Sequence, residues 1–345
     1  MTEVLEPARI QARVPRPPRA AGLAAALAAL VLVTVASVVV GTKQIPLGTV
    51  YDALIHYTGT PDEIVVRGQR VPRTLLGLCA GAALGLAGAL MQALTRNPLA
   101  DPGLLGVDAG AGAATVAAIG LFGLSSPSQY VWAAFAGAGL VAAAVQLLGS
   151  RGPAGAAPTR LVLAGAALSA VCAAFVSTML LTDPQTFDAY RFWQVGSLSG
   201  RGLDVLGPLL PFFGLGTVLA LGLARPLNAL ALGADTGRAL GVHQARTTAL
   251  GMTAVVLLCG AATAACGPIM FIGLAVPHIA RALVGPDHRW MLPYCLVLAP
   301  TLLIGADVVG RLVVRPGELS AGFVTAFLGA PVLIALVRAG RAVRL

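Results

Sequence analysis

The chain has 345 residues, of which 57% are hydrophobic and 11% charged, and its formal net charge is +9. Soluble domains carry about 25% charged residues, so this composition excludes a soluble protein and indicates an integral membrane protein. The apolar segments are long rather than short and alternating, which argues against a β-barrel. The five cysteines form no C-x-x-C pair and no cluster with histidine, so we expect neither a disulfide framework nor a bound metal.

A basic segment opens the chain and contains Arg9, Arg13, Arg16 and Arg19. An apolar run follows, over about residues 20–40, and it is too long for the core of a signal peptide. We therefore expect it to be the first membrane span. Residues 1–20 are then a cytoplasmic tail, residues 21–340 a single transmembrane domain and residues 341–345 a second cytoplasmic tail.

The remaining chain alternates between apolar runs that can cross a bilayer and short polar breaks. We predict an all-α, polytopic membrane protein with about ten transmembrane helices. The predicted spans are residues 21–41, 72–94, 105–124, 130–149, 160–181, 204–224, 248–266, 268–284, 290–313 and 320–338. With a cytoplasmic N-terminus, fifteen basic residues fall in cytoplasmic segments and eight in outer segments. This agrees with the positive-inside rule and predicts that both termini are cytoplasmic.

Three glycines recur every four residues in the predicted span 72–94, namely Gly77, Gly81 and Gly85. This spacing puts them on one helix face and predicts close packing against another helix. The helix is expected to stop at Asn97 and Pro98, because proline cannot continue it and asparagine can accept a capping hydrogen bond.

Basic residues on the outer side need a reason, since topology selects against them. Five of them flank two helix ends: Arg67, Arg70, Arg73, Arg311 and Arg315. They either lie at lipid headgroups or pair with Asp62, Glu63 and Glu318, or they form a patch that docks carboxylates of an extracellular protein. Asp307 precedes Arg311 by four residues, so we expect an ion pair within that helix.

The longest cytoplasmic loop, residues 225–247, is amphipathic and contains Gly233, Gly237 and Gly241. Two short helices joined at Gly233 are expected there. They either lie on the membrane surface or insert into a groove of a partner protein. Lys43 is the only lysine and is not part of a G-x-x-x-x-G-K-[ST] motif, so any ATP hydrolysis belongs to another polypeptide.

Several motifs together resemble the FecCD-type permeases. They are RVPRTL at residues 70–75, GALMQAL at 88–94, NPLADPGLLG at 97–106 and GPIMFIGLAVPHIARALVGPDHRWMLP at 267–293. The resemblance covers about residues 20–341. Such permeases are the membrane subunits of ABC importers for ferric siderophores, haem and cobalamin. The resemblance therefore implies the permease fold of a type II ABC importer.

The resemblance also implies roles for particular residues. Those expected to dock a binding protein are Arg70, Arg73 and Arg311. Those expected near the cytoplasmic gate are Asn97, Leu99, Pro158 and Thr159, although Pro158 replaces the small hydroxyl residues common there. Those expected to couple to the ATPase are Leu232, Gly233, Asp235, Thr236, Leu240 and Gly241, while Gly237 replaces the usual alanine.

The segment FWQVGSL at residues 192–198, with Asp235 and Thr236, is most similar to the ferric-enterobactin branch. We expect a permease that imports a ferric siderophore, a catecholate first, with haem and cobalamin as alternatives. The chain would hold no catalytic residue, metal or cofactor, and partner ATPase subunits would bind ATP. Its other partners would be a substrate-binding protein and a second permease, and it would bind no nucleic acid. The branch resemblance favours a paralogue as the second permease, with an identical copy as the alternative.

The same resemblance places the chain in the cytoplasmic (inner) membrane of a bacterium. One alternative of a different class is a proton-coupled secondary transporter. That mechanism needs coupling carboxylates within the membrane, and the sequence offers few of them.

Overall fold

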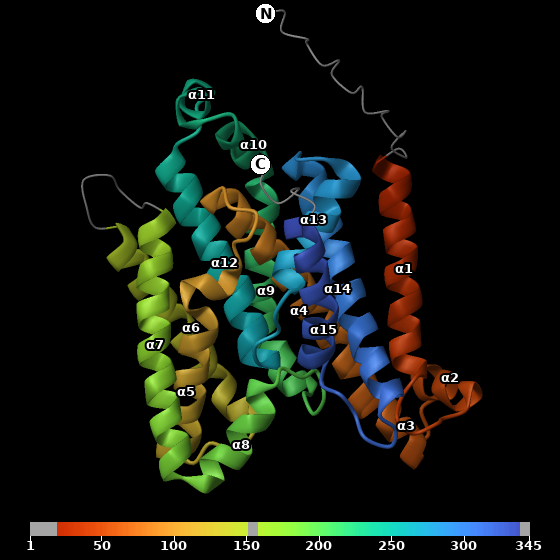
Figure 1. Ribbon diagram of the computed structural model, residues 1–345. Coiled ribbons are helices and arrows are strands. Elements are labelled where there is room, and N and C mark those ends of the chain that lie inside the picture. Colours follow the sequence, from red (N-terminus) through yellow and green to blue (C-terminus); the bar gives the residue numbers. More distant parts are fainter. Residues whose placement is uncertain (1–18, 151–157, 339–345) are drawn as a thin grey trace, which may run out of the picture.

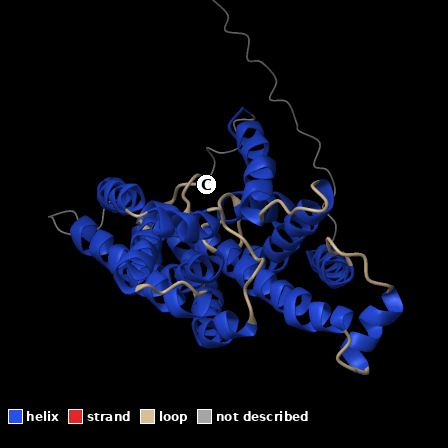
Figure 2. Cartoon of the chain, turned by 90° about the horizontal axis from the view of Figure 1, so that it is seen from below, coloured by secondary structure: helices blue, strands red, loops and turns tan. Residues whose placement is uncertain are grey.

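The computed structural model describes residues 19–150 and 158–338 of this chain. These residues form helices and their connections, without a strand (Figure 2). Each of the ten predicted spans is confirmed as a helix, with ends displaced by at most four residues. They are α1 (Arg19–Val39), α4 (Val71–Thr95), α5 (Val107–Phe122), α6 (Pro127–Ser150), α7 (Pro158–Thr182), α9 (Leu203–Gly222), α12 (Gln244–Cys266), α13 (Ile272–Val284), α14 (His288–Val313) and α15 (Ala321–Arg338).

Seven helices in the described part of the chain are long and apolar enough to cross a membrane. The other three predicted spans are shorter apolar helices, namely α5, α13 and, in α15, the stretch Ala321–Pro331. The prediction of a helix from residue 268 is wrong for its first residues, because Gly267 and Phe271 adopt left-handed backbone conformations. A Cβ on Gly267 would lie 2.0 Å from the Trp193 carbonyl oxygen, so the close approach requires glycine here.

Three short helices were not predicted from the sequence: α2 (Leu47–Ile55), α3 (Pro61–Val65) and α8 (Pro184–Gln194). A capping box between Thr60 and Glu63 begins α3, and Asp183 caps α8 by accepting from two backbone N–H groups. A π-helical turn (Val66–Arg70) joins α3 to α4, so the chain is helical without a break from residue 61 to 95.

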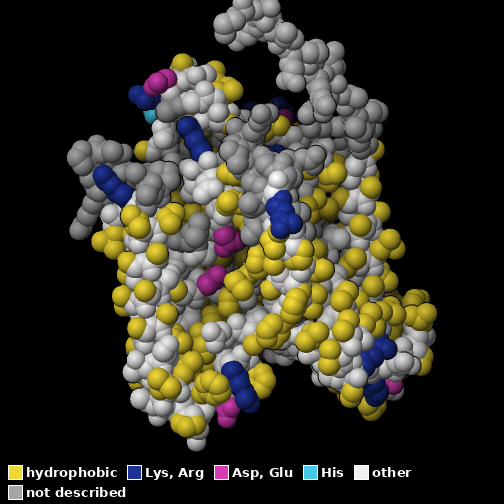
Figure 3. Space-filling view, in the orientation of Figure 1, with side chains coloured by type: hydrophobic (Ala, Val, Ile, Leu, Met, Phe, Trp, Pro, Cys, Tyr) yellow, Lys and Arg dark blue, Asp and Glu magenta, His cyan; other side chains and the backbone are white. Residues whose placement is uncertain are grey.

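The core of the bundle is built around α4, which packs against α12, α13 and α14. Helices α5, α6 and α7 form one flank, and α1 packs on α14 at the other (Figure 1). We call the end with α10 (Ala224–Ala231) and α11 (Ala234–Ala239) the coupling end, and the opposite end, with α2, α3 and α8, the arginine end. Between the two ends, the face shown in Figure 3 is mostly hydrophobic.

Close packing of the α4 glycine face is confirmed. A Cβ on Gly81 would lie 2.4 Å from the Pro300 Cα, and one on Gly85 would lie 2.4 Å from the Ala299 Cβ, both on α14. One turn further along, a Cβ on Gly88 would lie only 1.9 Å from the Gly273 carbonyl oxygen of α13. The backbones of α4 and α13 therefore meet with no side chain between them.

We predict that Gly88→Ala lowers the thermal unfolding temperature of the purified protein in detergent, because the added methyl group must push the α13 backbone away. The matched control is Gly139→Ala, since a Cβ at Gly139 in α6 meets nothing within 4 Å. That control should be neutral or slightly stabilising, because alanine favours helix by about 1 kcal/mol over glycine. Equal unfolding temperatures for the two variants would contradict the close contact.

Candidate functional site

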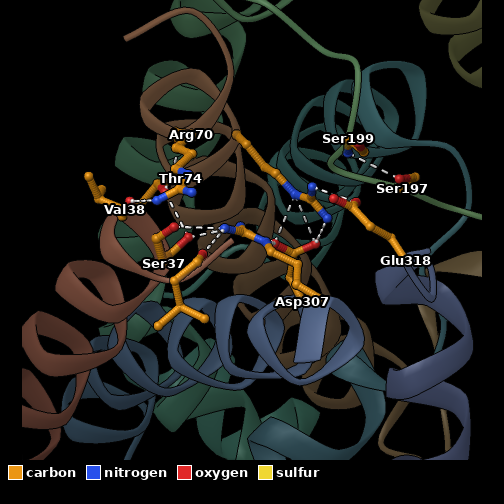
Figure 4. Close-up of polar contacts among 11 residues, drawn as sticks. Ser37, Val38, Arg70, Thr74, Ser197, Ser199, Asp307 and Glu318 are labelled. Carbon is orange, nitrogen blue, oxygen red and sulfur yellow. Dashed lines mark hydrogen bonds and ion pairs between the residues drawn. The ribbon is translucent and has the colours of Figure 1, made fainter. Parts of the chain in front are cut away.

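A buried carboxylate, Asp307 of α14, organises the arginine end (Figure 4). Arg73 of α4 donates from Nη2 to Asp307 Oδ1 over 2.7 Å and from Nε to Oδ2 over 3.0 Å. Arg311, one turn along α14, donates from Nε to Asp307 Oδ2 over 3.0 Å. The predicted pair between Asp307 and Arg311 is therefore confirmed, and Arg73 joins it from another helix.

The remaining donors of these arginines bind the end of α1 and the loop before α15. Arg311 Nη1 donates to the Ser37 carbonyl over 2.7 Å and to the Val40 carbonyl over 3.0 Å. Arg73 Nη1 pairs with Glu318 over 2.7 Å, as the pairing interpretation expected. The last carbonyls of a helix have no partner within it, so Arg311 caps the C-terminal end of α1.

Arg70 caps the same helix end from the π-helical turn before α4. It donates to the carbonyls of Val38 (3.0 Å), Val39 (2.6 Å) and Lys43 (2.6 Å). Arg70, Arg73 and Arg311 are 5%, 8% and 2% exposed, so all three are buried within this chain. Their predicted role in docking a binding protein is not tested by this geometry and stays a prediction.

The other cations that were predicted on the outer side have different partners. Arg67 donates to the carbonyls of α2, and Arg315 donates to the Gly41 carbonyl, so neither pairs with the acids considered above. Lys43 pairs with Asp62. Glu63 instead accepts from the backbone and hydroxyl groups before α3.

A cavity of about 440 Å³ opens beside these side chains at the arginine end. Five cations line it, and Glu318 is the carboxylate among its lining residues. The charged and amide residues of the lining are Lys43, Gln69, Arg70, Arg73, Arg201, Arg311 and Glu318. Sequence reasoning did not single out Arg201, which enters the cavity from the loop before α9.

The predicted gate residues fall in two separate turns near the coupling end. Asn97 follows α4, and its Oδ1 accepts from the Leu99 N–H over 2.9 Å, which shapes the turn as expected for a helix stop. Both residues are exposed. Pro158 and Thr159 form the first turn of α7. Whether these four residues line a gate is untested and stays a prediction.

The predicted pair of short helices in the loop 225–247 is confirmed as α10 and α11, which meet at Gly233. Gly233 (φ +112) and Gly241 (φ +79) bracket α11 in conformations that favour glycine. Leu232 is 67% exposed and Leu240 is 60% exposed, although both are large and apolar. Asp235 and Thr236 are exposed as well.

A polar clamp that was not predicted holds α10 against the bundle. Asn228 donates from Nδ2 to Asp287 over 2.6 Å and accepts at Oδ1 from the His288 backbone and Nδ1. Arg96, after α4, donates to the Leu230 carbonyl over 2.9 Å. The sequence signal for it was a single asparagine within the amphipathic loop 225–247.

Asp287 is the N-cap of α14 as well as the partner of Asn228. Partial burial raises its pKa, but the hydrogen bonds from Asn228 and the Arg289 N–H outweigh burial and hold the pKa below its ordinary value. The carboxylate is therefore ionised and remains an acceptor at neutral pH. The described residues contain no group of three or more His, Cys, Asp or Glu side chains arranged to hold a metal ion.

We predict that Asp307→Asn strongly destabilises the protein, by about 3–5 kcal/mol, because it leaves two buried guanidinium groups without their shared charge partner. Thermal unfolding of the purified protein measures the effect. Asp188→Asn is the matched control, since Asp188 pairs with Arg191 on the surface of α8, where both side chains are more than half exposed. The control should cost at most about 1 kcal/mol. A small effect at both positions would contradict the organising role of Asp307.

Comparisons with known proteins agree along nearly the whole chain. The chain is 50% identical over 320 residues to the ferric enterobactin transport system permease protein FepD of Escherichia coli (strain K12), covering 93% of this chain and 96% of that protein. It is 39% identical over 305 residues to the probable siderophore transport system permease protein YfiZ of Bacillus subtilis (strain 168), covering 88% and 92%.

A solved structure of a metal-chelate type ABC transporter, in an inward-facing conformation, superposes with a TM-score of 0.81 at 27% identity. That match covers 93% of this chain and 99% of the other. The FecCD transport family matches residues 29–339. The chain is therefore a multi-pass membrane protein that belongs to the FecCD transport family.

Proposed function

We propose that this chain is the permease subunit of an ATP-driven ABC importer that takes up ferric siderophores across the bacterial cytoplasmic membrane. The observation that carries the proposal is the 50% identity to a ferric enterobactin permease over almost the full length of both chains. Other relatives are named as permeases for siderophore, iron-hydroxamate and iron-citrate import. Iron chelates are therefore favoured over haem and cobalamin, and a catecholate chelate is favoured first.

Partner subunits follow from the same proposal. The sequence has no phosphate-binding loop of its own, so a separate pair of ATPase subunits supplies the energy. The short helix α11 is flanked by the exposed Leu232 and Leu240, and this segment suits insertion into a groove on that ATPase. A second permease, a paralogue rather than an identical copy, completes the translocation path, and both termini lie in the cytoplasm.

The arginine end suits the proposed docking of a substrate-binding protein. Arg70, Arg73 and Arg311 carry more positive charge than Asp307 and Glu318 offset, and the cavity beside them is also positive. Because their donors are already engaged within the chain, they contribute to docking through the field that they create at this end. Asn97, Leu99, Pro158 and Thr159 remain the proposed gate.

The ATPase contact predicts that Leu232→Ser and Leu240→Ser reduce co-purification of the ATPase subunits with the permease. Both changes remove apolar surface that a groove would bury, at roughly 1.5–3 kcal/mol per leucine. Leu47→Ser is the matched control, because Leu47 is 68% exposed at the arginine end, away from the proposed contact. If both variants bind the ATPase as well as the wild type does, the alternative that α11 lies on the membrane surface would be favoured instead.

Uptake in cells tests the function itself. A strain that lacks this chain should lose uptake of a radiolabelled ferric catecholate and regain it with the wild-type gene. Competition with unlabelled ferric hydroxamate, haem and cobalamin ranks the substrates. Uptake should require both the ATPase and the binding protein. Uptake by this chain alone, driven by a proton gradient, would instead support the secondary transporter.

A further inference from the structure

Arg201 is a buried guanidinium group that lines the cavity at the arginine end and pairs with no described carboxylate. Arg201 is 8% exposed, and its Nη1 donates to the Tyr130 hydroxyl over 2.6 Å. Its guanidinium carbon lies 5.7 Å from the centroid of the same ring. Within residues 19–150 and 158–338, its Nε is buried without a hydrogen-bond partner, and no acid forms an ion pair with it.

The other guanidinium groups that line the cavity are already engaged. Arg73 and Arg311 share Asp307, and Arg73 also holds Glu318. Arg70 donates to three backbone carbonyls. Arg201 differs from these three arginines because one whole edge of its guanidinium group, Nε and Nη2, has no hydrogen bond to the described residues.

A buried charge without a partner is costly, and an anion that supplies the missing acceptors removes that cost. Nε and Nη2 form the fork that holds the two oxygens of a carboxylate, or two neighbouring oxygens of a chelating group. The cavity volume of about 440 Å³ lies in the range of small-molecule sites, and its lining is strongly positive. The volume of the cavity, its positive lining and the unused fork of Arg201 therefore all favour a small anionic ligand.

We propose that this cavity is a receiving site for an anionic iron chelate, in which Arg201 donates to catecholate or carboxylate oxygens. The inference rests on the proposed function and adds a substrate contact to it. Arg201 lines the cavity but is only 8% exposed, so a carboxylate on the surface of a docking protein would have to enter the cavity to reach it. A small chelate that enters the cavity therefore suits the unused edge of Arg201 better than a carboxylate of the docking protein does. Chelates with net negative charge should be preferred over neutral ones.

Equilibrium binding tests the site directly. The complete importer is placed in lipid nanodiscs without its binding protein and titrated with a radiolabelled synthetic ferric tris-catecholate. Arg201→Gln should weaken binding about 10- to 100-fold, the range expected for losing charge-assisted hydrogen bonds. Arg201→Lys keeps the charge but loses the fork, so its affinity for the chelate should lie between those of the wild type and Arg201→Gln. A neutral ferric tris-hydroxamate should bind weakly to all three proteins.

Arg191→Gln is the matched control, because Arg191 lies at the same end, is exposed and pairs with Asp188. It should leave binding unchanged. Binding to the wild-type importer should also weaken as salt is raised, a result that needs no variant. Equal chelate binding by the wild type and Arg201→Gln would overturn the proposal. So would a variant that keeps chelate binding but loses docking of the binding protein, which would assign the fork to a protein carboxylate.

The same variants in cells separate this inference from the proposed function. If the wild type takes up no iron chelate, the proposed function fails. If the wild type takes up the catecholate, and Arg201→Gln does so with the same KM and the same nanodisc affinity, only the receiving site fails. If Arg201→Gln has a raised KM for uptake and also binds the chelate more weakly in nanodiscs, the result supports both the proposed function and the receiving site.

Discussion

One buried carboxylate shared by two arginines holds the arginine end together. Asp307 compensates the buried charges of Arg73 and Arg311. Without it, Arg311 would have no ion-pair partner and Arg73 would keep only Glu318, which is costly for buried charges. Their remaining donors reach the end of α1 and Glu318. Three parts of the chain that are distant in sequence are thereby fixed around one negative charge: the end of α1, the start of α4 and residues 307–318. The walls of the neighbouring cavity, including the place of Arg201, depend on that frame.

The two ends of the bundle are built on different principles. At the arginine end, arginine side chains join helix ends through ion pairs and through hydrogen bonds to backbone carbonyls. At the coupling end, Asn228 and Arg96 hold α10 to the bundle, while α11 is attached through two glycines with positive φ. A force applied to α11 would therefore reach α4 and α14 through α10. This contrast fits a rigid frame joined to a contact element that adapts to a partner.

Much of the fold could be predicted because lipid imposes simple rules. A span must be long and apolar, so hydropathy located the ten helices predicted as spans, and the glycine spacing on α4 predicted its packing. The pair between Asp307 and Arg311 followed from helix geometry alone. By contrast, the contact of Arg73 with Asp307 joins residues 234 positions apart, and no local pattern encodes it.

The missed features share a physical cause. Helices α2, α3 and α8 are short and lie outside the apolar runs, so only their caps, such as Asp183 before Pro184, could have indicated them. Arg201 and Asn228 are single polar residues, and the role of each depends on the side chains that surround it in the folded protein. Their roles appear only when burial and hydrogen-bond partners are known.

The capping of α1 by Arg311 affects when the helices can assemble during synthesis. Chains are made from the N-terminus, so α1 is complete long before α14 exists, and the contact between Ser37 and Arg311 spans 274 residues. Arg70 can cap Val38 and Val39 earlier, but until α14 exists water or lipid headgroups must satisfy the carbonyls of Ser37 and Val40. The first helix of this protein can therefore reach its final place only after the helix that carries Arg311 has entered the membrane.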